Sequence, residues 1–265
     1  MRSKLSFALS VCLLLALLAG TSLVSAQAAT PAATSSDPCA ALPDHDAVTA
    51  ALKTAQAEKN GGFGLNMWAT VVNRDGVVCV VTFTGNDRGD QWPGSRVIAA
   101  QKANTANDFS LPKLALSTAN IYSAVQPGGS LYGLQFSNPV DTSVAYGGDP
   151  ADWGQVNDPM VGQHIGGVNV FGGGLALYAA DGTLLGAVGV SGDSSCADHN
   201  IAWRTRHALK LDYVPAGVSP TNDDNIVYDI TNGVSKSGWG HPECSADATS
   251  IGNALVTTDP ISKAS

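Results

Sequence analysis

The chain has 265 residues, a formal net charge of −8 at pH 7 and only 14% charged residues. An acidic surface disfavours nucleic acid and anionic lipid as partners, although it leaves room for a small anionic ligand in a local pocket. The length beyond the N-terminal segment suits one sizeable domain or two small ones.

Residues 1–26 have the pattern of a secretory signal peptide. Arg2 and Lys4 give a basic start, Phe7 to Leu18 is an apolar run, and the small residues at 24–26 suit signal peptidase. The apolar run is shorter than the roughly 20 residues of a membrane-spanning helix. We therefore expect an exported protein, periplasmic or secreted, with residues 27–40 as a flexible leader.

The cysteine count fits export. Cys12 leaves with the signal peptide, and Cys39, Cys79, Cys196 and Cys244 remain. An even number of cysteines in an exported chain predicts two disulfides. Three pairings are open, and we favour Cys39–Cys244 with Cys79–Cys196. The chain has no C-x-x-C pair, which disfavours a four-cysteine metal site.

The first half of the mature chain predicts a helix, a hairpin and two more helices. Residues 44–58 have helical apolar spacing, and the β-branched runs 66–73 and 77–84 flank a hairpin turn at Asp75-Gly76. Residues 95–107 form the next expected helix, with Ser95 as its cap.

A third helix is expected at 111–123, with Pro112 in its first turn. Residues 126–163 are rich in Gly, Pro, Asp and Asn, and predict a long loop with at most one short strand at 132–136.

The second half begins with a further hairpin, 167–178 paired with 183–190, followed by a helix at 196–209. Residues 211–265 are polar and turn-rich, and predict an irregular C-terminal extension packed on a domain at 41–210. The element order predicts an α+β fold: a central antiparallel sheet of about five strands flanked by helices.

Three segments resemble the GlcG/HbpS-like heme-binding family. They are Val71 to Gly76 (VVNRDG), Ala99 to Ala106 (AAQKANTA, similar to A-x-x-K-A-x-T-A) and Gly182 to Gly192 (GTLLGAVGVSG, similar to G-x-x-x-G-A-[IV]-G-V-S-G). The likeness covers about 42–210. It implies a profilin-like α-β-α sandwich, frequent homo-oligomers, and heme as the cofactor of some members.

Two histidines are candidate heme-iron ligands. His164 ends the long loop and would supply a neutral imidazole, with Met160 as a soft second ligand; alternatively it is a loop residue bonded to backbone. His199 follows Asp198 at the start of a helix, where it either enters a ligand pocket or lies on the surface behind an acidic cap.

The family-like segments supply further candidates. Lys102 and Thr105 suit a heme propionate and a polar pocket wall, although packing and capping explain them equally well. The glycines at 172–174 allow close approach of a ligand, or form a bulge. The full candidate set for cofactor contact is His164, His199, Lys102, Thr105, Gly173, Gly174 and Ser191.

No catalytic residue is assigned. Ser191 lies in a sequence that lacks the last glycine of G-x-S-x-G, because Asp193 stands at that position. The glycines there suit a tight turn, and the hydroxyls and Asp193 suit a cap for the next helix. The absence of C-x-x-C-H excludes covalent c-type heme attachment.

These observations favour an exported protein that holds heme or a similar small planar ligand non-covalently, for scavenging, storage or sensing. Two alternatives stay open at this point. One is an enzyme of the same fold that acts on a small metabolite or on heme. The other is an oligomeric interaction protein without a ligand.

Overall fold

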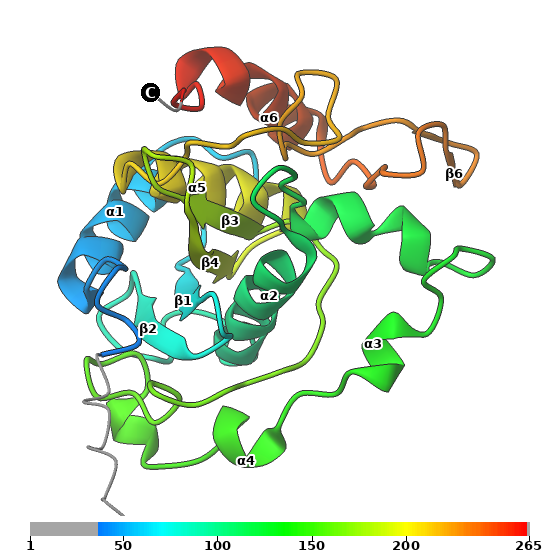
Figure 1. The fold of residues 1–265 in the computed structure, drawn as a ribbon. Coiled ribbons are helices and arrows are strands. Elements are labelled where there is room, and N and C mark those ends of the chain that lie inside the picture. Colours follow the sequence, from blue (N-terminus) through cyan, green and yellow to red (C-terminus); the bar gives the residue numbers. More distant parts are fainter. Residues whose placement is uncertain (1–36, 264–265) are drawn as a thin grey trace, which may run out of the picture. The chain divides into compact units, whose positions relative to one another are not determined.

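A computed structural model describes residues 37–263, so the expected signal peptide and most of the leader lie outside the described residues (Figure 1). The elements in chain order are α1 (His45–Ala57), β1 (Trp68–Asn73), β2 (Val78–Phe83), α2 (Ser95–Phe109), the 3-10 helices η1 (Thr118–Ile121) and η2 (Ser123–Val125), α3 (Leu134–Ser137), α4 (Thr142–Ala145), η3 (Pro150–Asp152), β3 (Gly174–Tyr178), β4 (Leu184–Ser191), α5 (Ser195–Ala208), β5 (Ile230–Thr231), β6 (Val234–Ser235) and α6 (Ala246–Thr258).

The central sheet has four strands in the order β2-β1-β4-β3, and every neighbouring pair is antiparallel. Val71 of β1 lies opposite Val80 of β2 on one side and Val188 of β4 on the other. The sheet confirms the α+β class. It has one strand fewer than about five, because the expected strand at 132–136 is a turn followed by the first residues of α3.

Helices cover both faces of this sheet (Figure 1). Helix α2 packs on β1, β3 and β4, while α1 and α5 pack together on the opposite face. Every residue of β1 and β3 is buried, as expected for strands covered on both sides. The architecture is thus the expected α-β-α sandwich. Within the described residues, no helix has the length and apolar character to cross a membrane.

Small residues set the distance between α2 and β4. A side chain at Gly189 would collide with the carbonyl oxygen of Ala99 and the amide nitrogen of Ala103. Both alanines are fully buried. Ala99 and Ala103 of the AAQKANTA segment and Gly189 of GAVGVSG therefore face each other across a close helix–strand contact.

The helix expected at 111–123 does not form. Leu111 and Leu114 exchange two backbone hydrogen bonds of 2.8 and 3.1 Å, and helical turns start only at η1. The Ser110 hydroxyl accepts the Leu116 N–H, and Ser117 and Asn120 form a capping box. These polar side chains bind nearby backbone groups and so replace a continuous helix with short turns.

Two other expectations about helices are wrong. Ser95 does not cap α2. It is the first residue of the helix, and the N-cap residue is Gly94, which has no side chain to accept a hydrogen bond. The C-terminal extension is not entirely irregular, because α6 lies within it and Ser245 caps it by accepting the Ala248 N–H. The buried face of α6 includes the small residues Ala248 and Gly252, so its apolar periodicity is weak.

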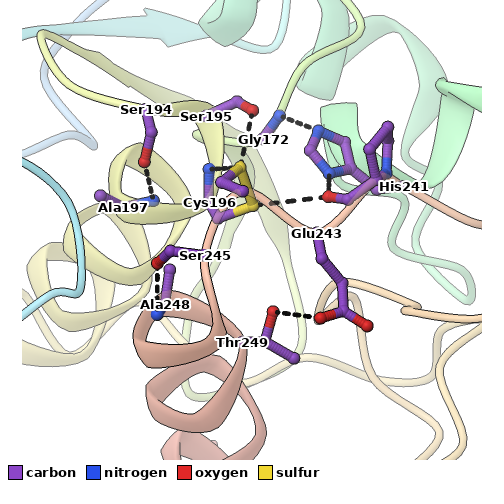
Figure 2. The surroundings of a disulfide bond; sticks show 12 residues. Gly172, Ser194, Ser195, Cys196, Ala197, His241, Glu243, Ser245, Ala248 and Thr249 are labelled. Carbon is purple, nitrogen blue, oxygen red and sulfur yellow. Dashed lines mark hydrogen bonds between the residues drawn. A yellow bond between two sulfur atoms is a disulfide. The ribbon is translucent and has the colours of Figure 1, made fainter.

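All four expected cysteines form disulfides, but the favoured pairing is wrong. The bonds are Cys39–Cys79 and Cys196–Cys244. Each joins cysteines that are neighbours in chain order, at separations of 40 and 48 residues. The first ties the leader to β2, and the second ties α5 to the turn before α6 (Figure 2).

Candidate functional site

A buried ion pair joins α2 to α5. The Nζ of Lys102 lies 2.7 Å from Oδ2 of Asp198, and it also donates to the Val190 carbonyl at 3.1 Å. The other carboxylate oxygen of Asp198 accepts the backbone N–H groups of Gly192 and Asp193. Both side chains are nearly inaccessible to solvent. The charge of Lys102 is therefore balanced by Asp198.

Burial raises the pKa of Asp198 to about 6, against the opposing effect of the Lys102 ammonium. The carboxyl still loses its proton below neutral pH. The ion pair is therefore intact at pH 7, where it is supported by hydrogen bonds from two backbone amides.

His199 is the next residue of α5, and its ring is fully buried. Neither ring nitrogen makes a hydrogen bond to any described residue. The Asn225 side chain lies close enough to raise the pKa of His199, although its amide nitrogen donates to the Gly252 carbonyl and its oxygen accepts the Ile226 N–H. Burial lowers the pKa of His199 well below its usual value, and the nearby Arg206 cation lowers it further. His199 is thus a neutral imidazole with an unused lone pair.

The glycines before β3 bring the chain close to both helices. A Cβ at Gly172 would collide with the carbonyl oxygen of Ser195 and lie 3.0 Å from the Cβ of His199. At Gly173, where φ is +120°, it would lie 3.0 Å from Nζ of Lys102. At Gly174 it would meet the backbone of Lys102. The protein itself occupies the space beside these glycines.

The hydroxyls of Thr105 and Thr118 bind the backbone of residues 169–174. Thr105 donates to the Gln101 carbonyl at 2.7 Å and accepts the Asn169 N–H at 2.9 Å. Thr118 of η1 accepts the Gly174 N–H at 2.9 Å. Ser191 lies buried at the end of β4, opposite Trp68. The structure therefore gathers six of the seven candidates around α2, β3 and the start of α5: Lys102, Thr105, Gly173, Gly174, Ser191 and His199.

The remaining candidate, His164, lies elsewhere. It is exposed, bridges to Val77, and lines a cavity of about 410 Å³ with Gly76 and Asn104. Val77 follows the C-terminal end of β1. Trp68, at the N-terminal end of β1, pairs with Ser191, which lies just before α5. His164 and His199 thus lie toward opposite ends of a six-residue strand, roughly 20 Å long. Met160 is fully buried in the core.

His241 lies beside the same cluster, although its place in the terminal segment gives little reason to expect it there. Its Nε2 accepts the Gly172 N–H at 3.4 Å, and its Nδ1 donates to the Pro242 carbonyl at 2.7 Å (Figure 2). The ring packs against Tyr122 with centroids 5.3 Å apart. Burial lowers the pKa of His241 to about 4, so it is neutral. Gly172 therefore contacts both His199 and His241.

A second buried ion pair lies about two turns further along α5. Arg206 donates to both carboxylate oxygens of Asp224, at 2.6 and 2.8 Å, and to the Ala176 carbonyl at 3.1 Å. Its guanidinium also lies 5.0 Å from the ring centroid of Trp203. Because Asp224 belongs to the C-terminal extension, this pair anchors the extension to α5.

The described residues contain no group of three or more His, Cys, Asp or Glu side chains that could hold a metal ion. The donor set available to a ligand is instead one neutral imidazole, His199, beside two buried cations. Both cations, Lys102 and Arg206, are already paired with carboxylates.

Comparison with known proteins gives a family match. The family model described as "Haem degrading protein HbpS-like" matches residues 44–206. A Klebsiella pneumoniae protein named ORFY and a PduOC:heme complex are both 25% identical to the chain, with TM-scores of 0.43. Each match covers 63% of this chain, and 90% and 94% of the respective neighbour.

A double mutant of Streptomyces reticuli HbpS is 18% identical, with a TM-score of 0.40, and the match covers 69% of this chain and 98% of that one. No curated protein matches the chain.

Proposed function

The chain belongs to the HbpS-like family, and from this premise we propose that it is an exported protein that binds heme or a similar planar ligand non-covalently. Scavenging, storage and sensing all fit such a protein. The observation that supports a site at the start of α5 is His199, a buried neutral imidazole with no hydrogen bond from either nitrogen. A buried polar group without a partner is costly, so its retention points to a ligand.

The residues present fit heme in their chemistry. Heme would supply an iron that binds a nitrogen ligand and two propionates that pair with cations. His199 supplies the nitrogen. Arg206 and Lys102 supply positive charge near that ring, as their effect on its pKa indicates. The glycines at 172–174 bring backbone, rather than side chains, to the same place.

The described conformation is closed, because Gly172 packs on His199 and His241 bonds to Gly172. Binding at His199 therefore requires the covering segments to move. The charges of both cations are balanced in this closed conformation, and a ligand carboxylate would compete with Asp198 or Asp224.

Titration of the mature chain with hemin tests this function. We expect a Soret shift at micromolar hemin, and at least a roughly tenfold loss of affinity in His199→Leu. The matched control is His164→Ala, which should bind as the wild type does because His164 lies outside the cluster. Equal affinity in wild type and His199→Leu would remove His199 from the site.

Heme degradation is a second candidate function, favoured by the description of the family. It predicts that hemin bound to the chain loses its Soret absorbance when a reductant and oxygen are added. Persistence of the Soret band, with hemin still bound, would leave binding as the function.

Export rests on the N-terminal sequence. The two disulfides support an oxidising compartment, since such bonds are rare in the cytosol. Assembly into a homo-oligomer is a prediction from the family resemblance, and size-exclusion chromatography tests it.

A further inference from the structure

One segment of the C-terminal extension closes the site around His199. This strap, residues 225–244, begins after Asp224, which pairs with Arg206, and ends at Cys244, which is bonded to Cys196. Both anchors lie on α5. The strap carries the β5–β6 hairpin and His241, and it lies outside the residues matched by the family model. The site is therefore closed by a part of the chain beyond the family domain.

The disulfide sets the position of the strap over the site. Cys196 lies three residues before His199 on α5, and Cys244 lies three residues after His241. Residues three apart on a helix share a face. Gly172 lies against His199. It also donates a hydrogen bond to His241, as Figure 2 shows. The Cys196–Cys244 bond thus holds His241 on the glycine that covers His199.

The middle of the strap, which forms the β5–β6 hairpin, is held more weakly than its ends. At the two ends of the strap Asn225, Ile226 and His241 are buried, and the Ser123 hydroxyl donates to the Gly240 carbonyl at 2.6 Å. The hairpin between these ends borders a cavity of about 710 Å³. That cavity separates Ile230 and Val234 of the strap from the 126–130 turn. Each strand of the hairpin has only two residues. Without the disulfide, the His241 end of the strap keeps its contacts with Tyr122 and Ser123 but loses its covalent link to α5.

The two cysteines differ in exposure. Cys196 is fully buried, whereas Cys244 is exposed. The Sγ of Cys244 accepts the Cys196 N–H at 3.2 Å and lies 3.4 Å from the Ser195 hydroxyl (Figure 2). Cys196 lies in the first turn of α5, where the helix N-terminus stabilises a thiolate. A nucleophile can reach Cys244, and Cys196 is a good leaving group.

We propose that Cys196–Cys244 is a thiol–disulfide exchange site through which a dithiol reductant opens the strap and uncovers His199. The ligand-binding consequence rests on the proposed function. A thiolate of the reductant attacks Sγ of Cys244, the S–S bond breaks, and its electron pair goes to Cys196. The second thiolate of the reductant then attacks the mixed disulfide and releases Cys244 as a thiolate. The reductant becomes a disulfide, and the two cysteines take up its two protons.

The experiment compares three forms of the mature chain: the oxidised wild type, Cys196→Ser/Cys244→Ser, and the matched control Cys39→Ser/Cys79→Ser. Hydrogen–deuterium exchange of peptides covering 168–174 and the strap should be at least about tenfold faster in the first variant than in the wild type. The control should match the wild type in these peptides. Equal exchange in all three forms overturns the proposal.

Hemin titration of the same forms separates this proposal from the proposed function. We expect at least roughly tenfold tighter binding in Cys196→Ser/Cys244→Ser than in the wild type. Equal binding in all forms overturns the control of ligand access while leaving heme binding intact. Faster exchange without hemin binding in any form supports strap opening and overturns heme as the ligand.

A second measurement covers the case in which the serine variant fails to fold. The wild type is treated with increasing dithiothreitol, and free thiols are alkylated and mapped. We expect Cys196 and Cys244 to be alkylated before Cys39 and Cys79, both of which are half-buried. Alkylation in the reverse order, or of all four together, overturns the proposal.

Discussion

Lys102 and Asp198 lie 96 residues apart in sequence, yet they form a buried ion pair with Nζ and Oδ2 2.7 Å apart. The pair joins the middle of α2 to the first turn of α5 across the end of β4. It lies beside His199 and beneath Gly173. The ion pair beside the candidate site therefore also connects the two helical layers.

Lys102→Met should strongly destabilise the protein. It leaves the Asp198 carboxylate buried without its cation, which costs about 3–5 kcal/mol when one partner of a buried pair is removed. Urea denaturation measures the change. The control is Lys59→Met at the exposed Lys59–Asp247 pair, where we expect less than about 1 kcal/mol. Similar losses in both variants would contradict the account of the pair.

His199→Leu should stabilise the fold while weakening ligand binding at least about tenfold. The substitution removes two buried ring nitrogens without partners, which we expect to raise the free energy of unfolding by about 1–2 kcal/mol. Urea denaturation again measures it. A loss of stability would mean that the imidazole has a structural role instead.

The protein should lose stability in mild acid through His241. Its folded pKa of about 4 lies below the ordinary value of 6.5, so the unfolded chain binds the proton more tightly. This group therefore contributes stability that is fully present above pH 6.5 and declines as the pH falls toward 4, by on the order of 3 kcal/mol. His199 acts in the same direction, since its pKa is also lowered.

The contribution of Asp198 to stability changes with pH in the opposite direction, so a His241 variant is needed to isolate the contribution of His241. Its folded pKa of about 6 lies above the ordinary 3.8, and its contribution declines as the pH rises through that range. Lys102 and Tyr122 are the other charged or titratable groups near His241. Stability measured from pH 4 to 8 should show a weaker acid loss in His241→Gln than in the wild type. Identical profiles would contradict the assignment.

Gly189→Ala should separate α2 from the sheet. The added methyl group collides with the backbone of Ala99 and Ala103, and neither can move without shifting the helix. We expect a loss of about 2–3 kcal/mol, as for an overpacked core. Gly94→Ala is the control, because nothing lies within 4 Å of its Cβ and its φ is −64°. A tolerated Gly189→Ala would contradict this packing.

The helices and hairpins that build the sandwich could be predicted from the sequence. The apolar spacing of 44–58 and the β-branched runs around Asp75-Gly76 agree with α1, β1 and β2. In these segments local propensity and tertiary packing favour the same structure. At 111–123 they differ, because the hydroxyls of Ser110 and Ser117 bind nearby backbone and end the regular structure.

The candidate site was predictable only in part. Lys102, Thr105 and His199 lie in or beside family-like segments, which pointed to them. His241 and Asp224 lie in the extension, and their roles depend on contacts with Gly172 and Arg206 that no spacing reveals. The predicted disulfide pairing was wrong because it too depends on contacts between distant segments. Four cysteines allow three connectivities, and sequence alone does not choose among them.

Hemin titration of the mature chain with the Cys196–Cys244 bond broken, in forms with and without His199, tests the central claim most directly. We predict a Soret shift at micromolar hemin in Cys196→Ser/Cys244→Ser. We also predict at least about tenfold weaker binding when His199→Leu is added, and unchanged binding when His164→Ala is added instead. No Soret shift in any form, or equal affinity with and without His199, would contradict the account.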